Sequence, residues 1–327
     1  MTRAKKEPID EDNIKRVLRR VENKNDKQTY QNWRSTYRNF YNFLLEEKGI
    51  DDVTEVDHID IEDYLFNLSE QGYASSSINK SYSALASLYS QLTEWFEVID
   101  ENPMERLNHG EYSQILDGVK KKDETGDEII YVTEAEVELM VQDAPSPSTR
   151  NQLMLKLLYQ TGVRASELAG MKVDNVDTES RSIHIKGSKT DEWRYVYYQK
   201  DLQQLMSIYL NSFRETLGPA PITDYLFPTY KTEQISPNSV NKMVVKAAEN
   251  AGIQTTMYED VNGAKRNRIT THAFRHGHCI MAARSGIDVK RIADHCGHKN
   301  IQRTQDYLDY IDEDVREAYH NKFGDVG

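Results

Sequence analysis

The stretch Asn262–Leu308 constrains this chain most, because a strong local charge and a set of ordered polar side chains coincide in it. It holds nine Lys and Arg against three Asp, a net of +6, whereas the whole chain of 327 residues carries −12. Five of the nine histidines also lie there. A basic stretch within an acidic chain predicts a binding site for a polyanion.

The same stretch has the spacing of a helix that would carry this site. Thr270 and Thr271 can cap a helix that begins near His272, and Gly286 can end it. The polar face of that helix would hold His272, Arg275, His276 and Cys279, and its inward face would hold Ala273, Gly277, Ile280 and Met281. Because Arg presents a fork of donors and His a donor near neutral pH, the polar face favours a phosphate.

Two more helices and a tyrosine are expected after this one. A short helix is predicted over Asp288–Asp294, and Asn300 can cap the next. The last helix would carry Thr304 and Tyr307 one turn apart, and Tyr307 follows His298 by nine residues. This order makes the predicted site more specific than its charge alone does.

Length and composition limit the classes of protein to consider. A chain of 327 residues favours about two domains. The two cysteines, Cys279 and Cys296, indicate a reducing compartment. No apolar run approaches the length of a membrane span, and the charged start MTRAKKEPIDED is not followed by the apolar stretch of a secretory signal. We therefore expect a cytoplasmic protein.

Charge is unevenly distributed along the first part of the chain as well. Residues Lys15–Arg38 carry a net of +6, and Glu46–Asp63 carry a net of −8. Two basic stretches in an acidic chain suggest two places where one polyanion is gripped. Solvated helix faces are the alternative for each stretch taken alone.

The first hundred residues predict a compact helical bundle. Residues 27–47 read as a long helix with Trp33, Tyr37, Phe40 and Leu44 on one face, and Tyr64, Leu65 and Leu68 mark a shorter helix. Another long helix opens at Ser75–Ser77 and stops before Asn102-Pro103. The charged run KKKDETGDE within residues 109–130 suits a linker between two domains.

The second half mixes helices with one hairpin. Thr133 and Glu136 form a capping-box pattern, and Gly162 can close the helix that contains Leu153, Leu157 and Leu158. Arg164 follows that glycine, a placement that is only suggestive by itself. Residues 181–198 alternate about Gly187-Ser188 as a hairpin would, with Lys189 at the turn, and residues 201–217 and 236–252 look helical.

The chain resembles the tyrosine recombinases of the phage integrase family. The resemblance rests on residues that stand in the family's order: Arg164, Lys189, His272-x-x-Arg275, Gly297-His298 and Tyr307. It implies a mainly α fold with a small antiparallel sheet, in a two-domain architecture. Residues 1–108 would form a helical core-binding (SAM-like) DNA-binding domain, residues 109–130 a linker, and residues 131–327 the catalytic domain with a C-terminal tail.

Carried over residue by residue, the resemblance assigns roles to this chain. Tyr307 matches the nucleophile, and Arg164 and Arg275 match the pair that binds the scissile phosphate. His272 and His298 match the supporting positions.

The resemblance is less definite at the hairpin and before Gly297. Lys189 matches the mobile lysine of the hairpin turn. Lys186 is a rival because other family members place the lysine in a Lys-Gly-x-Lys string, which would align differently here, and the turn also looks longer than in the shortest relatives. Cys296 stands where the family usually has Leu.

The activity implied is site-specific recombination of double-stranded DNA. Strands would be cleaved and rejoined through a 3′-phosphotyrosyl intermediate and a four-way junction, without ATP, metal or cofactor, by a homotetramer on two DNA sites. The acidic tail, a net of −4 over Asp309–Gly327, would dock on a neighbouring protomer. Integration or excision of a mobile element is the expected role, and Xer-like dimer resolution or type IB topoisomerase-like relaxation is the alternative.

Other interpretations of the same residues are weaker. The side chains of His278, Cys279, His295, Cys296 and His298 could bind zinc, but their spacing matches no common zinc pattern. Tyr310 could rival Tyr307, but it lacks the nine-residue spacing from His298. A DNA-binding protein that has lost its activity is disfavoured because every catalytic position is filled.

Overall fold

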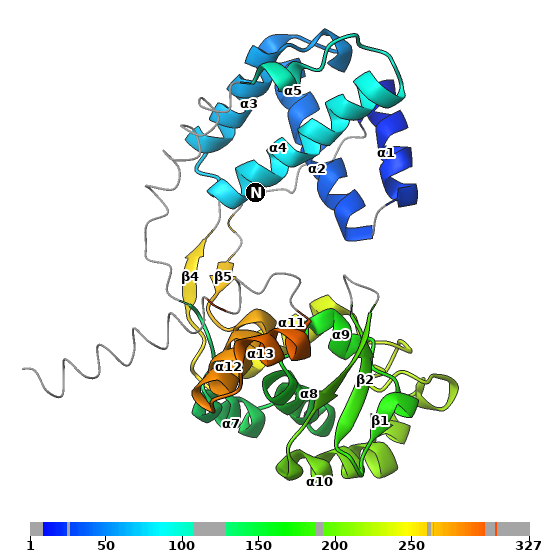
Figure 1. Cartoon of the computed structure of the whole chain (residues 1–327), viewed down its shortest axis with the longest axis vertical. Helices are drawn as coiled ribbons and strands as arrows, with labels where there is room; N and C mark the ends of the chain where they lie inside the picture. The colour runs from blue at the N-terminus through cyan, green and yellow to red at the C-terminus, as the bar shows by residue number, and fades with distance from the viewer. Residues whose placement is uncertain are drawn as a thin grey trace, which may run out of the picture. The chain divides into compact units, whose positions relative to one another are not determined.

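The computed structural model describes residues 9–24, 27–107, 129–187, 192–259, 263, 265–297 and 305. The chain divides into two compact units (Figure 1), one formed by Met1–Asp127 with Asp260–Gly263 and the other by Glu128–Glu259 with Ala264–Gly327. Across the described ranges, no helix is both long and apolar enough to cross a membrane. Lys189, His298, Asn300, Thr304, Tyr307 and Tyr310 lie outside the described residues.

The described part of the first unit is all helical. Its helices are α1 (Asp12–Lys24), α2 (Lys27–Phe43), α3 (His58–Glu70), α4 (Ser75–Ser90) and α5 (Pro103–Arg106). Short π-helical turns, Leu44–Lys48 and Gln91–Trp95, extend α2 and α4, and Val53–Glu55 forms a 3-10 turn. The bundle and its long helices match the prediction, although α1 was not foreseen as a separate helix.

Aromatic side chains form the centre of this bundle. Tyr37, Phe40 and Tyr89 are fully buried, and the Phe40 ring lies 5.1 Å from that of Tyr64 and 6.4 Å from that of Tyr89. Both buried phenols keep a hydrogen bond, Tyr37 to the carbonyl of Ala84 (3.1 Å) and Tyr89 to that of Val53 (3.2 Å). The predicted aromatic stripe of α2 therefore belongs to the core, since a buried hydroxyl is tolerated once it is bonded.

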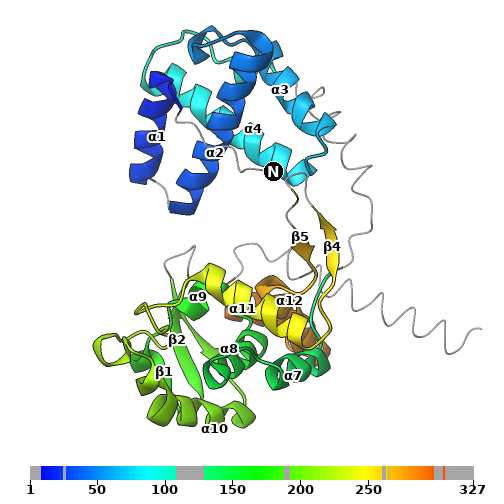
Figure 2. The same ribbon diagram turned by 180° about the vertical axis from the view of Figure 1, so that it is seen from behind.

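The second unit surrounds a buried helix with helices and a small sheet. Its helices are α7 (Glu134–Gln142), α8 (Ser148–Thr161), α9 (Ala165–Ala169), α10 (Lys200–Ile208), α11 (Pro237–Asn250), α12 (Thr271–Arg284) and α13 (Val289–Cys296). Three antiparallel strands lie in the order β1 (Val176–Asp177), β2 (Ser182–Lys186) and β3 (Trp193–Tyr197), and β4 (Thr256–Glu259) pairs with β5 (Lys265–Asn267). Helix α8 packs against α7, α10 and α12 (Figure 2).

Local sequence signals place most of these elements correctly. The capping box at the start of α7 is present: Thr133 Oγ1 accepts from the Glu136 amide and Glu136 Oε2 accepts from the Thr133 amide. Gly162 ends α8 in the left-handed conformation, at φ 62°. The hairpin is formed by β2 and β3, with Ile183 and Ile185 buried. The predicted fold class, mainly α with a small antiparallel sheet, is confirmed.

Helix α12 begins after Thr270, as predicted, but it differs from the prediction in two details. Thr270 is the N-cap residue but its side chain makes no capping bond; instead the amide of Thr271 donates to Asn241 Oδ1 at 3.1 Å. The predicted polar face is not open either, because Arg275 is only 3% exposed and Cys279 is fully buried. The reason is tertiary: α8 and α13 both pack on α12, and helical spacing in one segment cannot reveal a second covering element.

Candidate active site

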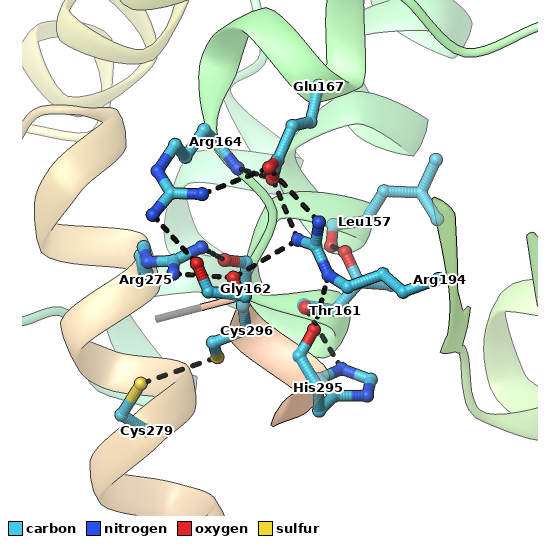
Figure 3. Close-up of polar contacts among 11 residues, drawn as sticks. Leu157, Thr161, Gly162, Arg164, Glu167, Arg194, Arg275, Cys279, His295 and Cys296 are labelled. Atoms are coloured by element: carbon cyan, nitrogen blue, oxygen red, sulfur yellow. Dashed lines mark hydrogen bonds and ion pairs between the residues drawn. The ribbon is translucent and has the colours of Figure 1, made fainter. Parts of the chain in front are cut away.

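Two arginines from distant parts of the sequence meet at the end of α13 (Figure 3). Arg164 follows the turn that closes α8, and its Nη2 donates to the carbonyl of Gly297 at 3.2 Å. Arg275, in α12, donates from Nη2 to the carbonyl of Cys296 at 2.6 Å and from Nη1 to that of Gly162 at 2.7 Å. Adjacent carbonyls thus hold the two guanidinium groups side by side.

The two guanidinium groups differ in their exposure. Arg275 is buried, and burial lowers its pKa, with the charge of Arg164 acting in the same direction and the thiol of Cys296 opposing it. An arginine nevertheless stays charged at neutral pH. The side chain of Arg164 is 27% exposed, so it can meet a ligand that arrives from solvent.

A buried carboxylate, Glu167 in α9, organises the site. Its Oε1 accepts from Arg164 Nη1 at 3.0 Å, and its Oε2 accepts from the Arg164 amide at 2.9 Å. Arg194 of β3 binds the same two oxygens with both of its terminal nitrogens, at 3.1 and 2.9 Å. Burial alone would raise the pKa of Glu167, but bonds to Arg194 and then to Arg164 hold that pKa below its ordinary value.

The charges of this group do not cancel. Arg164, Arg194 and Arg275 face one carboxylate, which gives a local net of +2 among the described residues. Backbone carbonyls take up several of the N–H donors but carry no net charge. A partly buried site with excess positive charge and planar donors suits a phosphate group.

The described histidines occupy different surroundings. His272 is exposed near the start of α12, and its ring lies 4.2 Å from that of His276. His276 Nδ1 lies 2.9 Å from the carbonyl of Ile130, and burial lowers its pKa. His272 therefore has access to solvent, whereas His276 is tied to the backbone before α7.

Two more histidines anchor α12 and α13 to the end of α8. His278 Nδ1 lies 3.0 Å from the carbonyl of Tyr159, and His295 Nε2 lies 3.1 Å from that of Thr161. The two rings stack at 5.2 Å. Burial, and then the charge of His278, lowers the pKa of His295. These contacts fix the helix ends that supply carbonyls to Arg164 and Arg275.

The two cysteines lie between the same helices. The Sγ atoms of Cys279 and Cys296 are 3.6 Å apart, and both residues are fully buried. A hydrogen bond with Cys279 lowers the pKa of the Cys296 thiol, against the effect of burial, and His278 and Arg275 lower that pKa further. No group of three or more His, Cys, Asp or Glu side chains fit to hold a metal ion occurs within the described ranges.

The remaining predicted residues divide between the hairpin and the end of the chain. Lys186 ends β2 and is exposed, whereas Lys189, which follows it in the sequence, lies outside the described residues. His298 and Tyr307 also fall outside them. Gly297 directly precedes His298 in the sequence, and its carbonyl is the acceptor of Arg164.

Sequence reasoning missed Glu167 and Arg194. One signal was available for Arg194, because it lies opposite Ile185 in a strand pair whose other inward residues are apolar. A charged residue at an inward strand position needs a buried partner of opposite charge. Glu167 lies three residues after Arg164, the spacing at which helical side chains meet.

Comparison with known proteins places these features. The family model described as "Phage integrase family" matches residues 131–313. The tyrosine recombinase XerC of Halalkalibacterium halodurans is 26% identical over 307 residues, covering 92% of each chain, and XerC of Lacticaseibacillus casei is 27% identical over 294 residues, covering 88% of this chain and 89% of its own.

Solved structures share the fold. The Tn1549 transposon integrase in complex with transposon right end DNA gives a TM-score of 0.67 at 16% identity, covering 94% of this chain and 99% of its own. The XerH site-specific recombinase bound to palindromic difH substrate gives 0.66 at 17% identity, covering 94% of this chain and 83% of its own.

Proposed function

Since the chain belongs to the phage integrase family and is a tyrosine recombinase, we propose that it cleaves and rejoins double-stranded DNA at specific sites through a 3′-phosphotyrosyl intermediate. The observation that carries the proposal is the meeting of Arg164 and Arg275 in a site with a net of +2. Arg164 and Arg275 donate to the carbonyls of Gly297 and Cys296, and His298 is the next residue in the sequence.

The proposed roles follow from the charge that develops on a phosphodiester under attack. Arg164 and Arg275 stabilise the extra negative charge of the phosphorane-like transition state, and one such donor is commonly worth about 2.7–4 kcal/mol. Tyr307 is the nucleophile; its phenol, with an ordinary pKa of about 10, must lose a proton to a neighbour. His272 and His298 orient the phosphate or carry that proton.

The steps balance without an external energy source. The Tyr307 oxygen bonds to phosphorus while the bond from phosphorus to the 5′ oxygen breaks, and that oxygen takes a proton from Lys189. The phosphotyrosyl bond keeps the energy of the original ester, so neither ATP nor metal is required. Attack by the 5′-hydroxyl of a partner strand reverses the step and exchanges the strands through a four-way junction.

The test is the formation of a covalent adduct. Purified protein is incubated with DNA that carries a candidate attachment site, and adducts that resist denaturant are measured. We expect an adduct that is lost in Tyr307→Phe and kept in Tyr310→Phe, the matched control. Arg164→Ala or Arg275→Ala should slow its formation by about 10²–10³-fold. An adduct that survives Tyr307→Phe would refute the assignment.

The identity of the general acid can be settled in the same assay. Lys189 is proposed and Lys186 is the alternative. A substrate whose 5′ leaving oxygen is replaced by sulfur needs no proton, because a thiolate leaves unaided. The lysine whose replacement slows cleavage of ordinary DNA but not of the sulfur substrate is the acid.

We also propose how the protein contacts DNA, how its copies assemble and which recombination it carries out. Residues 1–108 form the core-binding domain, and the exposed Arg16 and Arg19 of α1 supply a second grip on the DNA. Four copies act on two sites, joined through their C-terminal tails. Integration or excision of a mobile element is the proposed role, and the XerC relatives favour dimer resolution as the second candidate. Relaxation of a plasmid with a single site would instead indicate a topoisomerase.

A further inference from the structure

Arg194 occupies a strand position that would ordinarily be apolar. It lies opposite Ile185 on the face of the hairpin that also buries Ile183 and Val196, and its side chain is 15% exposed. A charge placed there costs free energy unless it is fully bonded. Arg194 meets that condition: two bonds go to Glu167, and two more reach the carbonyls of His295 (2.7 Å) and Cys296 (3.1 Å).

We propose that Arg194 is a positioning residue that acts through Glu167 to set the place and the available charge of Arg164. This inference rests on the proposed function, because it concerns the step in which Arg164 stabilises the phosphate. Arg194 is not itself a catalytic residue, since its bonds lead to the carboxylate and to the backbone of α13.

The charge balance at Glu167 supports the proposal. Each carboxylate oxygen of Glu167 accepts from both arginines. Oε1 accepts from the guanidinium groups of Arg164 and Arg194, and Oε2 accepts from the backbone amide of Arg164 and the guanidinium of Arg194. If Arg194 were absent, the carboxylate would pair with Arg164 alone and would neutralise it. With Arg194 present, Arg164 keeps positive charge that is available to a phosphate.

Arg194 also contacts Gly297, whose carbonyl accepts a hydrogen bond from Arg164. Gly297 has a φ of 67°, and a Cβ added there would lie 3.1 Å from Cζ and Nη1 of Arg194. The guanidinium of Arg194 therefore forms the surface on which Gly297 rests. Because the Gly297 carbonyl accepts from Arg164, both contacts of Arg194 determine where Arg164 lies.

The experiment measures single-turnover cleavage at saturating DNA, together with DNA affinity and thermal unfolding. We expect Arg194→Ala to slow cleavage by about 10–100-fold, as small displacements of a catalytic group do, with DNA affinity changed less than about threefold. Arg194→Lys keeps the charge but loses the two-pronged bond to Glu167, so its cleavage rate should lie between those of the wild-type protein and Arg194→Ala.

The matched control is Arg214→Ala. Arg214 is another buried arginine of this unit that donates to carbonyls, those of Ala220, Thr223 and Tyr225, and it takes no part in the hydrogen bonds of the site. Its loss should lower the unfolding temperature while the cleavage rate of the folded protein stays unchanged. A purely structural role for Arg194 predicts the same behaviour for Arg194→Ala.

A double-mutant cycle separates positioning from a general loss of structure. In an Arg164→Lys background, Arg194→Ala should slow cleavage by less than about threefold further, because the residue through which it acts is already altered. Full additivity, or a wild-type rate in Arg194→Ala, would overturn the inference. If Arg194→Ala does not fold, Arg194→Lys is used in the cycle. If wild-type protein forms no adduct, the proposed function fails instead.

Discussion

Gly162 serves three purposes at a single position. It ends α8 with a φ of 62°, its carbonyl accepts from Arg275, and the ring of His278 lies where a side chain would begin. A Cβ built on Gly162 would come within 2.5 Å of His278 Cδ2. Helix termination, an acceptor for Arg275 and the seating of α12 on α8 therefore all depend on the absence of a side chain.

Gly162→Ala is expected to destabilise the unit by more than backbone strain alone. A non-glycine residue in the left-handed region costs about 1–2 kcal/mol, and displacement of His278 adds to that. The control is Gly252→Ala, at a φ of 70° with nothing within 4 Å of the added carbon. Unfolding free energies of the two variants give the difference; equal losses would show that the His278 contact does not matter. Cleavage should fall in Gly162→Ala only.

Individual residues of the site were foreseen to different degrees. Gly162 was predicted to end a helix, and Arg164 and Arg275 were chosen as a pair from their order in the sequence. The hydrogen bonds that hold Arg164 in place were not foreseen, because they run through Glu167 and Arg194, which lie on different elements. Contacts between a strand and the ends of two helices leave no periodic trace in the sequence.

Secondary-structure elements were predictable where one face is buried and the ends carry capping signals. Helix α7 has its capping box, and the β2–β3 hairpin has its alternation. Strand β4 was missed because all four of its residues are exposed, so it has no apolar face to alternate. Helix α12 was found but its polar face was misjudged, since a second helix, α13, covers Arg275 and Cys279.

The packing of α12 and α13 predicts a loss of stability in mild acid. Burial lowers the pKa of His276 and of His295, so both stay neutral in the folded state at a pH where the unfolded chain has already bound protons. The contribution of these two histidines to the free energy of unfolding is therefore fully present above the ordinary histidine pKa of about 6.5. It declines as the pH falls below that value, by up to about 1.4 kcal/mol per pH unit for each histidine.

Denaturant titrations between about pH 8 and pH 5 measure this slope. Replacing His295 with Gln should reduce the slope by about the contribution of one proton. The pKa of Glu167 is lowered, so this carboxylate stays ionised throughout and contributes to acid denaturation only at lower pH. A flat stability from neutral pH to about pH 5.5 would contradict the prediction.

The chain as a whole contains separate hydrophobic cores. Each buried cluster draws its residues from one unit: Tyr37, Phe40 and Tyr89 belong to one, and Phe227 and Phe274 to another. The charged run in residues 109–130 and the helical spacing on either side of it predict a division into two domains. We propose that the boundary between the two domains lies within residues 109–130.

We predict that residues 1–108 and 131–327 fold separately when each is expressed alone, because each keeps its own core. The first fragment should be helical by circular dichroism and should bind DNA with an affinity that falls steeply with salt, since its contacts would be made by basic side chains to phosphates. The second should retain the arginine site but bind DNA more weakly than the full chain, having lost one of its two grips.

Reversal of charge at Arg16 and Arg19 on α1 should weaken DNA binding by the first fragment without unfolding it, because both side chains are exposed. An unfolded first fragment would refute the domain division, and a folded fragment that ignores DNA would refute the second grip while leaving the chemistry at Arg164 and Arg275 untouched.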